Sequence, residues 1–156
     1  MLITDTITRK IGEAMKAKDE IRLSTLRMLS SALNYEFIAK QHKLSDEEEI
    51  VVVRREAKKR KEAIDAFRQA QGKLTSSGTN MDERIAKEQK ELAILEEYLP
   101  PQISDEELTN IVDEAIAQTK ASSMVDIGKV MGFVKNKTAG NADGGKVVEI
   151  VKSKLA

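Results

Sequence analysis

Apolar residues recur at helical spacing along almost the whole chain, and this periodicity is the strongest constraint on the fold. Near the N-terminus, Ile3, Ile7, Ile11 and Met15 stand four residues apart. Such spacing places side chains on one face of an α-helix. No stretch of useful length shows the alternation typical of a β-strand, and aromatic residues, which strands favour, make up only 3% of the chain. The sequence therefore predicts an all-α protein.

Polar residues divide the first part of this pattern into two helices. Thr4 or Thr6 is expected to cap the first helix, which should end at about Lys18. Asp19 is the expected cap of the second. The predicted inner face of the second helix consists of Leu26, Leu29, Leu33 and Phe37.

A capping box marks the start of a long third helix. Ser45 and Glu48 have the spacing of a cap residue and its reciprocal partner, and the helix should reach about Gln71. Residues 72–80 are rich in Gly, Ser and Thr, which predicts a loop. A fourth helix is expected to open at Asp82 and to pack antiparallel on the third. The expected inner faces of these two helices are Ile50, Val53, Ala57, Ile64 and Phe67, and Ile85, Leu92 and Leu95.

Two consecutive prolines predict a domain boundary. Each of Pro100 and Pro101 lacks a donor N–H and holds the preceding residue out of the helical region. A second capping box, Ser104 to Glu107, follows at once. We therefore expect a four-helix bundle over residues 1–99 and a smaller three-helix domain over residues 102–156.

The last two helices of the chain should fold back on each other across a glycine-rich turn. Gly140–Gly145 supplies the turn, and Asp143 is placed to cap the final helix. The free N–H groups there suit a phosphate, but no strand precedes the turn, so a plain interhelical turn is favoured. Gly128 and Gly132 each cost about 1 kcal/mol relative to Ala in a helix. We expect another helix or a partner's backbone to approach these glycines closely.

The distribution of charge is more informative than its total, because the net charge is zero. From residue 120 to 156, seven lysines stand against three acidic residues, a local balance of +4. The basic cluster at residues 54–61 has the charge to grip phosphates. Acidic residues alternate with it, however, so a solvated helix face is favoured. Arg22 and Arg27 are likewise expected at a solvated helix edge.

The residues that most enzymes use are scarce in this sequence. The chain has no Cys and one His, His42, which lies in a polar segment between predicted helices. Thiolate chemistry, zinc sites and His-dependent triads are therefore not expected. We predict no catalytic residues, no metal, no cofactor and no small-molecule substrate, and a stand-alone enzyme is the least favoured hypothesis.

The N-terminal residues do not have the pattern of a secretory signal. Met1 to Asp5 contain no basic residue, and no long apolar run follows them. No apolar run approaches the length of a membrane span. A cytoplasmic protein without a membrane partner is the expectation.

Two segments, Tyr98–Ser104 (Tyr-Leu-Pro-Pro-Gln-Ile-Ser) and Asp126–Gly132 (Asp-Ile-Gly-Lys-Val-Met-Gly), together with Ala142-Asp-Gly, resemble the YqeY family. This family is similar to the tail domain of GatB and GatE, subunits of tRNA-dependent amidotransferases. The resemblance implies a non-catalytic helical unit that contacts tRNA and helps to present it to a catalytic core. The chain departs from the pattern at Ala139 and Asn141, where the family usually has basic residues. The matched positions are Gly128, Lys129, Gly132, Gly140, Asp143 and Gly144.

Two binding hypotheses follow. In the first, tRNA binds weakly to the C-terminal helices, where lysines pair with phosphates and Phe133 stacks on a base. An exposed Phe133 and a Phe133 buried against the N-terminal helices are equally compatible with the sequence. In the second, Gly128, Gly132 and Phe133 dock an amidotransferase or another protein, and RNA has no role. The predicted nucleic-acid-binding residues are Lys129, Phe133, Lys135, Lys137 and Lys146.

Overall fold

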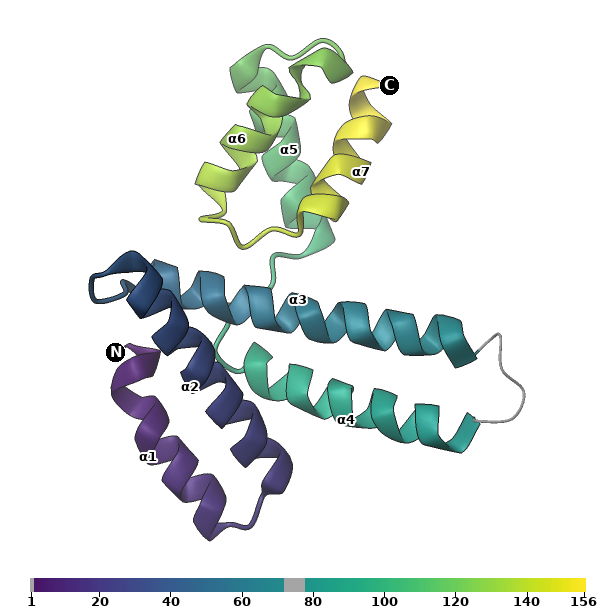
Figure 1. The fold of residues 1–156 in the computed structure, drawn as a ribbon. Coiled ribbons are helices and arrows are strands. Elements are labelled where there is room, and N and C mark those ends of the chain that lie inside the picture. Colours follow the sequence, from purple (N-terminus) through teal and green to yellow (C-terminus); the bar gives the residue numbers. More distant parts are fainter. Residues whose placement is uncertain (1, 72–77) are drawn as a thin grey trace. The chain divides into compact units, whose positions relative to one another are not determined.

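The computed structural model describes residues 2–71 and 78–156, and every regular element in these ranges is helical (Figure 1). The all-α prediction is therefore confirmed. The chain divides into two compact units, Met1–Leu99 and Pro100–Ala156. Leu99 packs against the core of the first unit and Ile103 against the core of the second. Independent folding of the two units stays a prediction.

The N-terminal unit consists of two helical hairpins. Helix α1 (Ile3–Lys16) lies beside α2 (Glu20–Lys40), and α3 (Asp46–Gln71) lies beside α4 (Gly78–Glu96) (Figure 1). Helix α2 also contacts α3 and α4, which joins the hairpins. Apolar side chains from all four helices and the α2–α3 connection form the main core: Ile7, Leu29, Leu33, Leu44, Val52, Val53, Ala57 and Leu95.

Two of the predicted helix starts form as expected. The N–H of Arg22 donates to Asp19 Oδ1 over 3.0 Å, so Asp19 caps α2. In the capping box of α3, the N–H of Ser45 donates to Glu48 Oε2 (3.0 Å) and the N–H of Glu48 donates to Ser45 Oγ (3.3 Å). Both bonds satisfy N–H groups that have no partner within the helix.

The prediction that Thr4 or Thr6 caps α1 is wrong. Helix α1 already begins at Ile3, and its first N–H groups are bonded by the carboxylate of Glu49, a residue of α3. The hydroxyl of Thr4 also donates to this carboxylate. Glu49 is only 1% exposed. A buried carboxylate from a distant helix therefore accepts the hydrogen bonds that a local cap residue would otherwise accept. The capping partner is more than forty residues away, beyond the reach of a sequence motif.

Two further expectations about the N-terminal unit need correction. Helix α4 begins at Gly78 and not at Asp82; residues 72–77 of the expected loop lie outside the described residues. Phe37, expected on the inner face of α2, is 47% exposed. Its side chain lines an open cleft between α1 and α2, because these helices do not close over it.

The C-terminal unit is a bundle of three short helices, α5 (Asp105–Thr119), α6 (Ile127–Lys137) and α7 (Gly144–Leu155). A 3-10 turn that the sequence did not indicate, η1 (Met124–Asp126), precedes α6. The N–H of Glu107 donates to Ser104 Oγ (3.2 Å), which confirms the cap of α5. The buried core of this unit comprises Leu108, Val112, Ala115, Val130, Val134, Val147 and Val151.

The predicted turn between α6 and α7 is confirmed. Gly140 adopts φ 74°, a left-handed conformation that glycine tolerates without a steric penalty. Asp143 caps α7, since its Oδ1 accepts a bond of 2.9 Å from the N–H of Gly145. The carboxylate therefore occupies the helix end where a phosphate was considered, which supports the plain interhelical turn.

Candidate nucleic-acid interface

Helix α6 has one face in the core and one face in solvent. Val130 and Val134 are buried. The residues exposed on the opposite side are Gly128, Lys129, Gly132, Lys135 and Asn136. At about 100° of rotation per residue, the two glycines lie between Lys135 on one edge and Lys129 on the other. We call these five exposed residues the α6 face; at its centre is a strip without side chains.

Within residues 100–156, no part of the C-terminal unit covers this glycine strip. A Cβ atom added at Gly128 or Gly132 would meet no atom within 4 Å apart from its own helix. The expectation that another helix approaches the glycines is therefore wrong for α5 and α7, the other helices of the C-terminal unit. Approach by a partner's backbone stays a prediction.

The four predicted lysines fall into two groups. Lys137 Nζ lies 3.2 Å from Glu114 Oε1, and Lys146 Nζ lies 3.3 Å from Asp105 Oδ1. Both carboxylates belong to α5. Lys129 and Lys135 are exposed and form no ion pair with any residue of the C-terminal unit, residues 100–156. The structure therefore leaves Lys129 and Lys135 as the predicted cations that have no competing carboxylate.

The positive balance predicted for the end of the chain is offset within its own unit. Residues 100–156 contain seven lysines and eight acidic residues. Helix α5 supplies five of these acids, and three of them pair with lysines of α6 and α7. Positive charge without a partner is therefore confined to a few sites, among them the two edges of the α6 face.

The structure defines the environment of Phe133 within its own unit, and burial against the N-terminal helices stays a prediction. It is partly buried and packs against the core of its own C-terminal unit. It stands four residues from both Lys129 and Lys137 and so shares their side of α6. The C-terminal bundle covers part of its ring, so Phe133 is not fully exposed.

A mainly apolar hollow of about 300 Å³ lies between α6 and α7, and the sequence interpretation missed it. Gly132 and Lys135 of the α6 face belong to its wall. Small residues keep the hollow open where the two helices approach the turn. The small residues were the available signal, but the glycines of the turn were explained by backbone conformation and Gly132 by the close approach of another helix or a partner. The lining residues are Met131, Gly132, Val134, Lys135, Thr138, Gly140, Ala142, Gly144 and Val147.

A sequence-family model described as Yqey-like protein matches residues 4–155. The chain belongs to the YqeY family. The match spans both helical units and the proline pair between them, which confirms that the resemblance covers almost the whole chain. No curated protein matches the chain.

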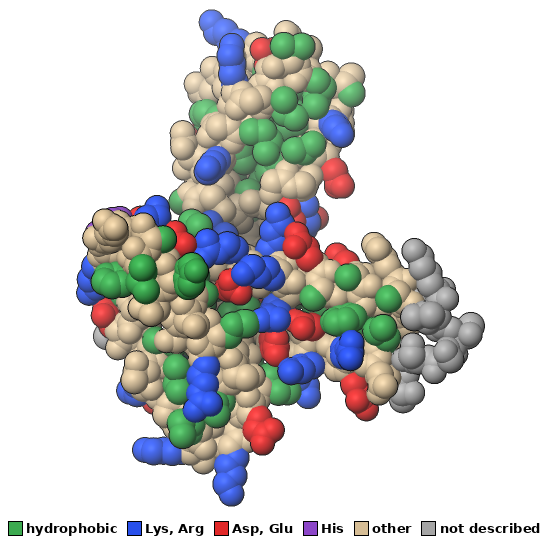
Figure 2. All heavy atoms as spheres, viewed as in Figure 1, with side chains coloured by type: hydrophobic (Ala, Val, Ile, Leu, Met, Phe, Trp, Pro, Cys, Tyr) green, Lys and Arg blue, Asp and Glu red, His purple; other side chains and the backbone are tan. Residues whose placement is uncertain are grey.

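The basic cluster on α3 of this YqeY protein is largely paired with acidic residues. Figure 2 shows Lys and Arg side chains interleaved with Asp and Glu side chains over α3 and α4. Arg60 Nη1 lies 3.2 Å from Glu88 Oε2, and Lys59 Nζ lies 2.9 Å from Glu56 Oε1. Arg55, Lys58 and Lys61 also form ion pairs. This pairing favours the solvated face over a phosphate grip.

Arg22, which was expected at a solvated helix edge, pairs with one specific carboxylate. Its guanidinium donates to both carboxylate oxygens of Glu97, at 2.9 and 2.8 Å, and so ties the start of α2 to the end of α4. The hydrogen bond from Arg22 lowers the pKa of Glu97 below its ordinary value, although partial burial opposes this shift. Both side chains are substantially exposed, so the pair contributes less than about 1 kcal/mol.

The described part of the YqeY chain shows no constellation of metal ligands. No three His, Cys, Asp or Glu side chains come together there as a metal site requires. His42 is 55% exposed, and its Nε2 lies 3.5 Å from Glu48 Oε1, a carboxylate that belongs to the capping box. None of the helices in the described ranges is both long and apolar enough to cross a bilayer.

Proposed function

We propose that this YqeY protein is a non-catalytic module that contacts tRNA through the α6 face. The observation that carries the proposal is the pair of exposed lysines, Lys129 and Lys135, on either side of a strip without side chains. Lysines pair with phosphates, and a bare stretch of helix lets a ribose–phosphate chain come close to the protein. The resemblance to amidotransferase tail domains indicates tRNA as the nucleic acid.

The proposal predicts binding that is salt-dependent and weakly selective for sequence. Phosphate contacts position a nucleic acid without reading its bases. Each lysine that neutralises one phosphate contributes about −0.9 to the slope of log K against log salt on duplex regions. Lys129 and Lys135 together should therefore account for a slope of about −2.

Charge reversal at the two lysines of the α6 face tests the proposal. In gel shifts across a salt series, Lys129→Glu with Lys135→Glu should abolish tRNA binding and leave helical content unchanged. Lys137 is unsuitable for this test, because a glutamate there would face Glu114 and strain the unit itself. A double variant with Lys18→Glu and Lys90→Glu is the matched control, since both lysines are exposed residues of the N-terminal unit without an ion pair in the described ranges.

The control variant has the same net charge as the test variant. Loss of binding in the test variant alone supports the α6 face. Equal loss in both variants assigns the effect to net charge, and absence of tRNA binding by the wild type at low salt rejects the proposal.

A second candidate function, a protein-interaction adaptor, is favoured by the hollow between α6 and α7. Its mainly apolar wall suits an apolar side chain better than a phosphate. Copurification with and without nuclease separates the two functions. A protein partner that survives nuclease treatment and is lost with Gly132→Leu, which fills the hollow, supports the adaptor.

A further inference from the structure

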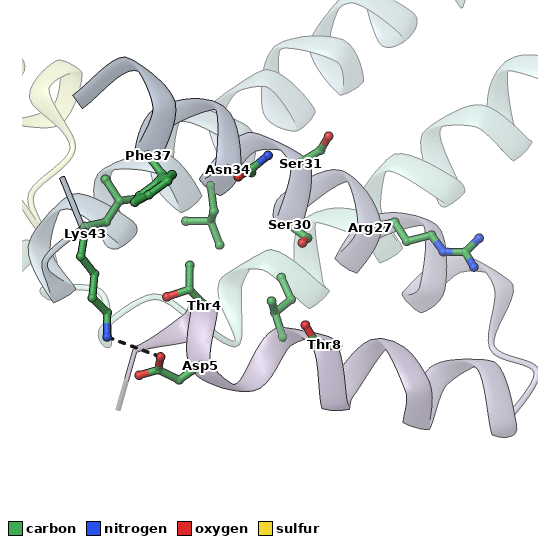
Figure 3. Close-up of a pocket in the computed structure, with 12 residues that line it drawn as sticks. Thr4, Asp5, Thr8, Arg27, Ser30, Ser31, Asn34, Phe37 and Lys43 are labelled. Carbon is green, nitrogen blue, oxygen red and sulfur yellow. Dashed lines mark ion pairs between the residues drawn. The ribbon is translucent and has the colours of Figure 1, made fainter. Parts of the chain in front are cut away.

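The N-terminal unit contains a cleft between α1 and α2 that the proposed function does not use (Figure 3). Its volume is about 620 Å³, within the usual range for small-molecule sites. Ile7, Leu33 and Leu44 are buried and form an apolar floor. Phe37 stands at one end with nearly half of its surface exposed, so an aromatic ring is accessible inside the cleft.

The polar side chains of the cleft are not committed to the protein. The hydroxyls of Thr8, Ser30 and Ser31 and the amide of Asn34 form no hydrogen bond with any residue in the described ranges. Other helical Ser and Thr residues donate their hydroxyl to a carbonyl three or four positions back. These are Thr6, Ser24, Thr25, Thr109, Thr119, Thr138 and Ser153. The cleft therefore gathers hydroxyls that remain available to a ligand.

The charges of the cleft differ between its ends. Beside Phe37, Lys43 Nζ lies 3.7 Å from Asp5 Oδ1, so this end is close to neutral (Figure 3). Arg27 lines the other end; its guanidinium contacts Met15 Sδ at 3.9 Å and has no carboxylate partner in the described chain. Ten residues of α2 separate Phe37 from Arg27, a rise of about 15 Å. In the structure Arg27 extends toward Met15 and away from Phe37 (Figure 3). An elongated ligand with its negative charge at one end fits the cleft when this exposed side chain turns back along α2.

We propose that the cleft binds one nucleoside 5′-monophosphate unit. The base stacks on Phe37, where the Asn34 amide can donate to and accept from its edge. The ribose lies along Thr8 and Ser30, and the phosphate pairs with Arg27. The Asp5–Lys43 pair leaves the Phe37 end close to neutral, whereas Arg27 has no carboxylate partner in the described chain, and this difference sets the orientation. The site is independent of the α6 face.

The same chemistry has two sources, a free nucleotide and a single unstacked nucleotide of an RNA strand. Calorimetric titration of the full chain with AMP, GMP, CMP and UMP tests the first, and a short unstructured oligoribonucleotide tests the second. Adenosine lacks the phosphate and ribose 5-phosphate lacks the base, so each should bind more weakly than AMP. Binding only to the oligonucleotide, with the same dependence on Phe37, assigns the site to an RNA strand.

Two variants separate stacking from charge. Phe37→Leu removes the ring and should weaken binding about 5- to 150-fold, the range for one stacked base. Arg27→Gln should weaken the phosphate compounds and leave adenosine unchanged. Tyr35→Leu and Arg9→Gln are matched controls, because both residues are exposed on α2 and α1 but do not line the cleft. Neither control should change the affinity.

Three results would overturn the proposal: no binding of any nucleotide or of the oligonucleotide at millimolar concentration, equal affinity for AMP and ribose 5-phosphate, or equal effects of Phe37→Leu and Tyr35→Leu. These results are distinguishable from a failure of the α6 face, because that face is tested with other variants and with tRNA. Nucleotide binding that survives Lys129→Glu with Lys135→Glu shows that the two sites are separate.

Discussion

Replacing Gly132 with alanine should stabilise the protein. Gly132 lies in the interior of α6, and a Cβ atom there meets nothing within 4 Å outside the helix backbone. The substitution thus has no steric penalty, and the free energy of unfolding should rise by about 0.8–1.0 kcal/mol, the difference in helix propensity. Part of the gain comes from the lower conformational entropy of the unfolded chain. For a unit of this size the melting temperature should rise by about 4–8 °C.

Thermal and urea unfolding measure this gain, and Gly12→Ala provides a matched control. Gly12 lies in α1, and a Cβ atom there also meets nothing within 4 Å. The control should stabilise the N-terminal unit by a similar amount and leave tRNA binding unchanged. Comparing the two variants therefore separates an effect of stability from an effect at the α6 face.

The functional consequence of Gly132→Ala should be opposite to its effect on stability. If tRNA approaches the glycine strip closely, the added methyl group lies in the interface and weakens binding even as the protein becomes more stable. Destabilisation by Gly132→Ala would refute the open surface around the strip. Stabilisation with unchanged tRNA affinity would refute the argument that the bare strip matters for binding.

Three further substitutions test other contacts. Glu49→Gln replaces the carboxylate that accepts hydrogen bonds from the start of α1, so the free energy of unfolding measured in urea should fall by about 2–4 kcal/mol. Glu47→Gln is the control, because Glu47 is exposed and its replacement should change this free energy by less than about 0.5 kcal/mol. Glu97→Gln should cost less than about 1 kcal/mol at pH 7. The pKa of Glu97 is lowered in the folded state, so its contribution to the free energy of unfolding is present above the unfolded pKa of about 4.3 and is lost as the pH falls through the folded pKa. A difference in unfolding free energy between Glu97→Gln and the wild type that persists at lower pH contradicts the pairing. Phe133→Ala should lower the melting temperature, because the free energy of unfolding falls by about 1–2 kcal/mol when a half-buried ring is removed. The tRNA affinity per folded molecule should stay unchanged. A loss of affinity in gel shifts without a loss of stability would support the stacking role instead.

Local signals in the sequence were sufficient for most helix starts. Asp19, Ser45, Ser104 and Asp143 all form the predicted caps, because a cap depends on residues within one turn of the helix. The start of α1 was missed because its cap, Glu49, comes from another helix. A local rule cannot detect a partner that only tertiary packing brings into place.

The exposure of single side chains was harder to predict than the helices. Phe37 continues the apolar stripe of α2 by four residues, yet it is exposed because no neighbouring helix closes over that end. Phe133 lies outside the main stripe of α6, yet the bundle covers part of it. Helical spacing tells which side of a helix a residue occupies, but the extent of burial depends on where the neighbouring helices end.

The charge of the C-terminal unit shows the same dependence on tertiary contacts, with a consequence for RNA binding. The segment from residue 120 to 156 has a balance of +4, but α5 precedes it in sequence, packs against it and carries five acidic residues, three of which pair with its lysines. A phosphate that approaches Lys137 must compete with Glu114, and one that approaches Lys146 must compete with Asp105. Exposed ion pairs are weak, so both lysines can leave their carboxylates and pair with phosphates. The net gain in binding free energy from this exchange is small, because one ion pair is lost for each one formed. The salt dependence of tRNA binding should therefore reflect Lys129 and Lys135 more than the lysine count, with a slope of log K against log salt nearer about −2 than −4.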